Sequence, residues 1–518
     1  MSETKFYSKH IFVFPFRYQK KEKGKKENLY PDLKEIKKHI SSDFWEEFEF
    51  RHKIYDNYHT YNEFVYFFPQ VRDVLNLKDT EEDKILNVLQ YQYRKTGGLT
   101  PEYEIHIKNS KKENEIYSLE IEDVTLNFYP NGIGMFVFHL KNNKYPFTDA
   151  ILKINDYGRR IFPQYLGSYN DIVDAPKDSF LADKIILRNL STEFGTLIEE
   201  DFSYYNDLDR LNAQAFRLPK HIGMLLGSAF YSDTQQKTLY RITPILDDRM
   251  FTVSFYLNSA WMGFLEKWNK TTGTYAYKTD ETWYQYIFVD GKYPSVRNKE
   301  LLKKQLEEHT YARWLEGGQL YGMSRYSFVF LGSDERFHRN VLDKHISTLY
   351  FQMVLLVLLQ RAYLVYFGGE VARLANKLEH TENLEDYVDE INRLYLDYIK
   401  FINRIYFREA SPQEQGIELY EMMQEKMRIK RDVDDLEREI GDLNEYVERY
   451  QERRLTRLAA KYLPVTLLAG ILGMNTITGL RWNFNHPELW PTVFGILNVI
   501  IVGYAIWILT RQFITKKL

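Results

Sequence analysis

Two apolar segments near the C-terminus constrain this chain most, because each is suited to crossing a lipid bilayer. The first ends in Gly473-Met474-Asn475, and the second begins at residue 491. A crossing helix needs about 20 residues, so the first must extend back to residue 458 to reach that length. The sequence therefore predicts a membrane hairpin over residues 458–518, with crossing helices at about 458–475 and 491–510.

Charge placement around this hairpin predicts its orientation. The flanking cations are Arg453, Arg454, Arg457 and Lys461 before the first helix, and Arg511, Lys516 and Lys517 after the second. The connecting loop carries only Arg481. Lys and Arg concentrate on the cytoplasmic side of membranes, so we expect both termini inside the cell. Residues 1–19 mix charged and apolar positions and do not resemble a signal peptide, which agrees with a cytoplasmic N-terminal part.

The composition bounds the remaining function classes. A chain of 518 residues is long enough for two or three domains. Its formal net charge of -3 gives no polyanion-binding bias, so we expect no direct binding of nucleic acid, while a local nucleotide pocket stays open. The sequence contains no Cys, which excludes disulfides, thiolate catalysis and zinc sites of the cysteine type.

The N-terminal part reads as a large mixed α+β domain over residues 1–340, with a sub-boundary near residue 110. Alternation over residues 115–127, a turn at 129–132 and an apolar return over 134–140 predict a β-hairpin. A helix is expected over 147–161. Further expected elements are strands at 238–246, 250–257, 283–289 and 326–331 and a helix at 296–314.

Long helices follow in a helical region over residues 341–412. The apolar run 349–367 contains Gln352, Gln360 and Arg361, which are costly at bilayer depth, so a buried soluble helix is favoured over a third crossing. Further helices are expected at 370–380 and 383–407.

A stalk helix is predicted over residues 413–457. Its apolar residues recur in alternating steps of four and three, as in a coiled-coil seam: Ile429, Val433, Leu436, Ile440, Leu443, Val447 and Tyr450. An amphipathic helix in a soluble bundle is the alternative. Because the helix runs straight into the membrane segment, we favour a symmetric stalk around a pore.

The first crossing segment carries a motif of eight residues: Pro464, Thr466, Ala469, Gly470, Ile471, Gly473, Met474 and Asn475. In this register it resembles the first crossing helix of the CorA family of divalent-cation channels, with Leu472 replacing the usual tyrosine. The resemblance implies a homopentamer in the bacterial inner membrane that conducts Mg²⁺ or another divalent cation. It further implies that Asn475 forms the first ion-binding ring, shaped by Gly473 and Met474, because amide oxygens can hold a cation that keeps its water.

Deeper in the pore, the resemblance implies that Thr466 forms a second polar ring. Leu463, Ala459 and Leu455 lie near the same face, and apolar rings there could close the pore by dewetting. The alternatives are that Thr466 bonds its own helix and Leu463 merely packs. Two explanations remain for the basic residues at 453, 454, 457 and 461. The favoured one is that they fix the orientation of the hairpin in the membrane, and the alternative is that they form a cytosolic ring that holds back cations.

Two departures from the family bear on function. The loop after Asn475 is longer and carries Arg481, with Glu488 as its acidic residue, so Mg²⁺ selectivity is in doubt. The N-terminal domain is also larger than in the family, which suggests another gating input. In this the chain is similar to CorA-type effectors associated with type III CRISPR systems, which implies gating by a nucleotide second messenger in antiviral defence. Two alternative functions remain: constitutive uptake of a divalent cation regulated by the metal itself, and a membrane scaffold that conducts no ions.

No motif supports an enzyme. The sequence lacks His-Glu-x-x-His, a phosphate-binding Gly-rich loop, a dinucleotide fingerprint and a Gly-x-Ser-x-Gly elbow. His338 and His345 lie near Asp334, Glu335 and Asp343 without the spacing of a known ligand set, so we expect these residues at the surface.

Overall fold

The computed structural model describes most of the chain. The described residues are 6–21, 32–48, 58–76, 88–94, 98–108, 114–162, 181–202, 217–232, 238–270, 273–291, 293–379 and 385–473, with the single positions 500 and 504. Two compact units are present: Met1–Arg373 with Leu396–Glu437, and Leu374–Tyr395 with Arg438–Leu518. The first unit holds a large sheet with many helices, so the expected mixed α+β class is confirmed for it.

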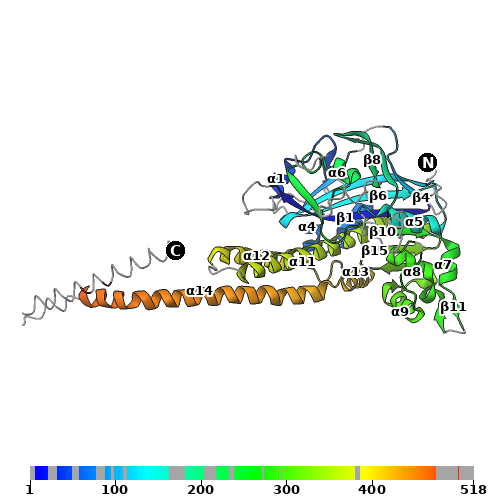
Figure 1. Ribbon diagram of the computed structural model, residues 1–518. Coiled ribbons are helices and arrows are strands. Elements are labelled where there is room, and N and C mark those ends of the chain that lie inside the picture. The colour runs from blue at the N-terminus through cyan, green and yellow to red at the C-terminus, as the bar shows by residue number, and fades with distance from the viewer. Residues whose placement is uncertain are drawn as a thin grey trace, which may run out of the picture. The chain divides into compact units, whose positions relative to one another are not determined.

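One large sheet organises the first unit (Figure 1). Its main path runs β13-β14-β15-β10-β1-β6-β5-β4-β7-β8 in the described residues. The pairings along it are antiparallel except for the parallel pair of β10 and β15. The strands are β1 Ser8–Lys20, β2 Trp45–Glu47, β3 Leu89–Tyr93, β4 Glu102–Lys108, β5 Asn114–Tyr129, β6 Ile133–Asn142, β7 Lys184–Thr192, β8 Gly195–Asp201, β9 Tyr240–Pro244, β10 Phe251–Leu257, β13 Thr310–Tyr311, β14 Gln319–Met323 and β15 Ser327–Gly332, with a separate small pair, β11 Trp268–Asn269 and β12 Thr274–Tyr275.

Helices cover the sheet and form the long C-terminal elements. They are α1 Leu33–Lys37, α3 Tyr58–Tyr66, α4 Pro69–Val74, α5 Thr148–Gly158, α6 Lys220–Leu226, α7 Ser259–Leu265, α8 Glu281–Phe288, α9 Lys299–His309, α10 Asp343–Ser347, α11 Leu349–Glu379, α12 Glu385–Arg404, α13 Glu414–Lys426 and α14 Ile429–Gly473, with short 3₁₀ turns that include η4 Ala276–Thr279 and η5 Leu315–Gly317.

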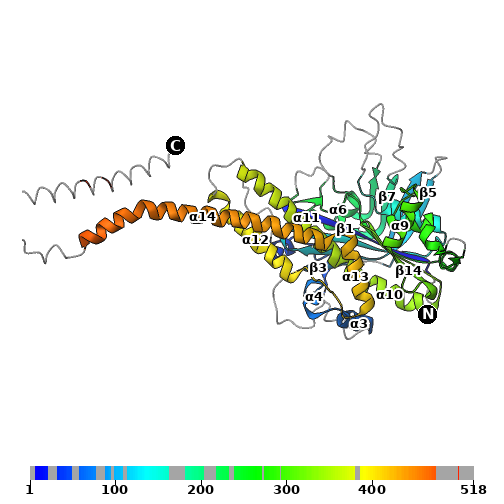
Figure 2. The ribbon, with the colours of Figure 1, turned by 90° about the horizontal axis from the view of Figure 1, so that it is seen from below.

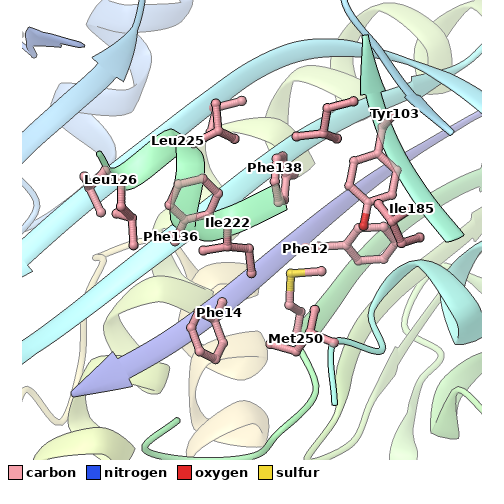
Figure 3. Packing of buried hydrophobic residues seen from close by; sticks show 14 of the residues in the cluster. Phe12, Phe14, Tyr103, Leu126, Phe136, Phe138, Ile185, Ile222, Leu225 and Met250 are labelled. Atoms are coloured by element: carbon pink, nitrogen blue, oxygen red, sulfur yellow. The ribbon is translucent and has the colours of Figure 1, made fainter. Parts of the chain in front are cut away.

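The two faces of the central strands pack against different helices, because successive side chains of a strand point to opposite faces. Phe12 and Phe14 of β1 join Phe136 and Phe138 of β6 and Ile222 of α6 in one core (Figure 3). On the other face, α11 packs: the His139 and Phe351 rings lie 4.9 Å apart, and Arg17 pairs with Glu370 at 3.0 Å. Burial of β1 on both sides explains the unbroken apolar run at residues 11–16 in its middle.

The predicted hairpin is confirmed as β5 and β6. The turn between them contains Asn131 and Gly132, which both have positive φ, at 62° and 75°. Asn and Gly tolerate this conformation better than other residues. The adjacent Gly134 is required for a second reason, because a Cβ there would lie 2.3 Å from the buried Phe16 ring. The expected helix at 147–161 is also present, as α5.

The strand predicted over residues 283–289 is wrong, since this segment is helix α8. The Asp280 side chain caps it by accepting a hydrogen bond from the Trp283 backbone N–H at 2.6 Å. Trp283, Tyr286 and Ile287 then fall on one buried face in a second core beside the sheet. Aromatic and β-branched residues favour strands, but the cap and this core overrule that preference. The predicted helix at 296–314 ends early, at His309, and Thr310–Tyr311 form β13.

Helix α11 accounts for the apolar run at 349–367. In the described part of the chain, one helix, His338–Leu378, has the length and apolar composition of a membrane span, and 83% of its apolar window is buried within the fold. Its polar residues have partners: Gln360 donates to the Ile405 carbonyl at 2.9 Å, and Arg361 pairs with Asp432. This burial favours the interior-helix interpretation. The separate helix expected at 370–380 is the continuation of α11.

The single helix predicted from residue 413 is divided. Helix α13 ends at Lys426 and α14 begins at Ile429, with Arg428 between them at a φ of 59°. Neither glycine nor proline marks this break in the sequence, which is why a continuous helix was expected. In the first unit α13 lies beside β14 (Figure 2), where the Tyr311 hydroxyl of β13 donates to Glu418.

Candidate functional site

The candidate site is the C-terminal part of helix α14, whose surroundings change along its length. At the seam positions Ile429, Val433, Leu436, Ile440 and Val447, no more than 4% of the surface is exposed within a single chain. In the first unit the Tyr398 hydroxyl reaches the Val433 carbonyl at 3.5 Å. These five seam positions are therefore covered within the same chain, as expected for an amphipathic helix in a bundle, whereas the seam residues Leu443 and Tyr450 are half-buried. The symmetric stalk around a pore stays a prediction.

Beyond residue 450 the helix is almost uncovered. From 451 to 466 the described side chains are exposed apart from the half-buried Leu458 and Val465. Leu455 and Leu463 are 66% and 67% exposed. Burying one leucine side chain is worth roughly 1.5–3 kcal/mol. A helix end with this much exposed apolar surface therefore gains free energy from a cover that the described part of the chain does not provide.

The expected pore-lining residues share one side of the helix. At 3.6 residues per turn, Leu455, Ala459, Leu463 and Thr466 fall within an arc of about 80°. We call these four residues the exposed stripe. Leu455 and Leu463 are its apolar positions, and Thr466 supplies its hydroxyl.

Thr466 forms a hydrogen bond within its own helix, which is one of the two roles that the sequence left open for it. Its hydroxyl donates to carbonyls of its own helix, at 3.1 Å from Tyr462 and 3.0 Å from Leu463. A hydroxyl has one proton and two acceptor positions. This bond therefore uses the donor and leaves the oxygen able to accept from water.

The predicted basic residues lie on the other side of α14. Arg453, Arg454, Arg457 and Lys461 are exposed, and they fall in an arc of about 100° centred roughly opposite the exposed stripe. A helix cannot present both groups to one pore. If the stripe faces a pore, the cations face outward, where long basic side chains can reach lipid phosphates. The geometry thus favours the topological explanation of these residues over a ring that holds back cations.

The Gly-Met-Asn motif is described only in part. Gly473 is the last residue of α14, whereas Met474 and Asn475 lie outside the described residues. The second crossing helix also lies outside them, apart from positions 500 and 504.

The surface location expected for the residues near 340 is confirmed for Asp334 and Glu335 and is wrong for His338 and Asp343, while His345 is half-buried. His338 is buried and its Nδ1 lies 2.6 Å from the Ser333 carbonyl. Asp343 is buried against Lys9 at 2.9 Å, and burial raises the pKa of its carboxyl while Lys9 opposes the shift. Within the described ranges, no group of three or more His, Asp or Glu side chains is arranged to hold a metal ion.

No family model matches the chain, and no curated protein matches it.

Proposed function

We propose that this chain is a subunit of a CorA-like homopentameric membrane channel that conducts Mg²⁺ or another divalent cation. The observation that carries the proposal is the exposed stripe, which ends seven residues before Gly473-Met474-Asn475. Copies of the chain gathered around an axis would cover this stripe. Residues 458–475 and 491–510 would then form an inner and an outer ring of crossing helices.

The residues have distinct roles in such a channel. A ring of Asn475 amides would accept hydrogen bonds from the water shell of the cation, which Mg²⁺ gives up reluctantly. Gly473 and Met474 would shape the turn at this mouth. Further inside, Thr466 offers acceptor oxygens, and the Leu463 and Leu455 rings form apolar constrictions that close by dewetting.

We further propose that the large cytosolic domain gates this pore in response to a nucleotide second messenger, as part of type III CRISPR antiviral defence. Support for a signal-gated effector comes from the size of the first unit, which holds the whole sheet and two cores. Support for a mechanical connection comes from α13, which contacts the sheet through Tyr311 and leads into α14.

Cation flux into liposomes tests the proposal. The purified full-length protein is reconstituted with a Mg²⁺ indicator inside the vesicles, and influx is followed with and without added nucleotide. Influx that requires the nucleotide is the expected result. If influx occurs without nucleotide and is stopped by Mg²⁺ inside the vesicles, the protein is a metal-regulated transporter and not a signal-gated effector. An assembled protein that conducts under neither condition would contradict the channel.

A further inference from the structure

A cleft in the first unit has the size of a small-molecule site. It has a volume of about 480 Å³, within the range of roughly 300–1,000 Å³ that ligand pockets occupy. We call it the Arg313 cleft. Its lining comes from β12 and η4 on one side and from the segment around η5 on the other: Tyr275, Tyr277, Lys278, Ala312, Arg313, Trp314, Leu315, Glu316 and Gly317. A second cavity, beside Tyr363 and Phe401, measures about 110 Å³, too small for such a ligand.

Aromatic rings are exposed in and beside this cleft. Trp314 is 46% exposed, and the half-buried Tyr275 ring stacks on the buried Tyr277 ring with centroids 6.2 Å apart. Trp268 lies edge-on to Tyr275 at 4.9 Å. Exposed rings on a concave surface offer stacking faces to a planar ligand. Trp283, which also lies in this region of the fold, is fully buried, so the exposure of Trp314 is a local feature.

Two cations are placed beside these rings. The Lys278 Nζ lies 6.0 Å from the centre of the Tyr277 ring and pairs with Glu307 at 3.1 Å, and the Arg313 guanidinium lies 5.7 Å from the centre of the Trp314 ring. The planar guanidinium both stacks on aromatic rings and binds phosphate with two hydrogen bonds. The cleft therefore combines a stacking surface with phosphate-binding groups, although Glu316 also contributes one carboxylate to the lining.

Arg313 connects the cleft to the helix that leads to α14. Its guanidinium pairs with Glu418 at 2.7 Å and with Glu414 at 3.3 Å, both on α13. These ion pairs are exposed, and exposed ion pairs contribute little to stability. An anionic ligand in the cleft can therefore compete with the two glutamates for Arg313.

We infer that the Arg313 cleft binds a nucleotide, with its base against Trp314 and Tyr275 and its phosphate on Arg313 and Lys278. Binding takes Arg313 from Glu414 and Glu418 and so removes two ion pairs between the cleft and α13, while the Tyr311 hydrogen bond to Glu418 remains. This step rests on the proposed function, because α13 continues through Arg428 into the helix assigned to the pore. Ligand binding and pore opening then share one side chain, and each favours the other.

Binding of AMP to the full-length protein in detergent tests the site, by calorimetry and by quenching of tryptophan fluorescence. Adenosine and inorganic phosphate, each carrying one half of the AMP chemistry, should bind at least tenfold more weakly than AMP. Arg313→Gln and Trp314→Ala should each weaken AMP binding at least tenfold. Arg297→Gln is the matched control, since Arg297 also lies over an exposed ring, that of Tyr293 at 5.3 Å, but outside the cleft.

The Glu418→Gln variant tests the competition. Because this change removes a competitor for Arg313, AMP should bind severalfold more tightly, the opposite of the Arg313→Gln effect. No AMP binding by the wild-type protein, equal binding by Arg313→Gln and Arg297→Gln, or weaker binding by Glu418→Gln would overturn the inference. The assay needs no ion flux. AMP binding without ion flux would therefore contradict the proposed channel and leave the nucleotide site standing. Nucleotide-dependent flux that persists in Arg313→Gln would contradict the nucleotide site and leave the channel standing.

Discussion

The Gln360 amide nitrogen donates a hydrogen bond of 2.8 Å to the Tyr420 hydroxyl, and this buried contact ties α11 to α13. Gln424 donates in turn to the Gln360 side-chain oxygen at 2.9 Å. A polar residue in the middle of an apolar helix is therefore part of a closed network, and the network holds α13 in the first unit.

Replacing Gln360 should cost stability. In Gln360→Leu, the half-buried Ile405 carbonyl and the buried Tyr420 hydroxyl each lose a hydrogen-bond donor, whereas the Gln424 amide keeps its bond to the Phe407 carbonyl, so we expect a loss of about 1 kcal/mol in the free energy of unfolding. Chemical denaturation followed by tryptophan fluorescence measures it. The double variant Gln360→Leu/Tyr420→Phe should lose little more than the single one, because the two groups belong to one network. Unchanged stability of Gln360→Leu would contradict this role.

Acid should destabilise the fold through two buried histidines. Burial lowers the pKa of His10 to about 4, and burial lowers that of His221 to about 3. Below pH 6.5 the unfolded chain binds protons at these positions while the folded chain does not, so stability falls as the pH falls. At pH 5 each histidine should cost about 2 kcal/mol relative to pH 7.

The His221→Phe variant isolates one of these contributions. Neither ring nitrogen of His221 has a hydrogen-bond partner among the described residues, and the ring lies between Tyr103 and Phe138. The variant should therefore be more stable at pH 7 by about 1 kcal/mol. Its loss of stability between pH 6.5 and 4.5 should be smaller than that of the wild type but not abolished, because burial also lowers the pKa values of His10 and His139 to about 4. Unfolding curves at several pH values measure both effects, and an unchanged pH slope would count against the assignment.

Two glycine substitutions should act in opposite directions. Gly134→Ala places a Cβ against the buried Phe16 ring, and overpacking of this kind costs about 2 kcal/mol. Gly441→Ala lies in α14 with no atom within 4 Å of the added carbon, so it should stabilise by up to about 1 kcal/mol through helix propensity. Thermal unfolding of both variants gives the comparison. Equal effects would mean that the packing around Gly134 is looser than described.

Because the chain lacks cysteine, single cysteines can test which side of α14 lines the proposed pore. Ala459 belongs to the exposed stripe, and its neighbour Ala460 points about 100° away. A charged thiol reagent should block liposome flux strongly in Ala459→Cys and weakly in Ala460→Cys. The wild type, which has no thiol, is the control for the reagent itself. Equal block at both positions would contradict the assigned face.

Local patterns predicted part of the fold and only some features of the candidate site. Alternating residues around Asn131-Gly132 predicted the hairpin, and helical spacing alone placed Leu455, Leu463 and Thr466 on one side of a helix, whereas their exposure came from the structure. Thr466 could either bond to its own helix or line a pore, and the spacing of residues in the sequence did not distinguish these two roles.

By itself, the sequence determined the features that depend on neighbours within a few positions: the hairpin around Asn131, the helical spacing of Leu455 and Leu463, and the polar interruptions in α11. Tertiary structure decided the rest. It made residues 283–289 a helix by burying Trp283 beside the sheet, and it covered the seam at Val433 within one chain. It also brought Tyr275 and Trp314 to one cleft. These outcomes depend on which surfaces, distant in the sequence, pack together. Hydrophobic periodicity predicts that one face of an element will be buried, but it does not predict which other element covers that face.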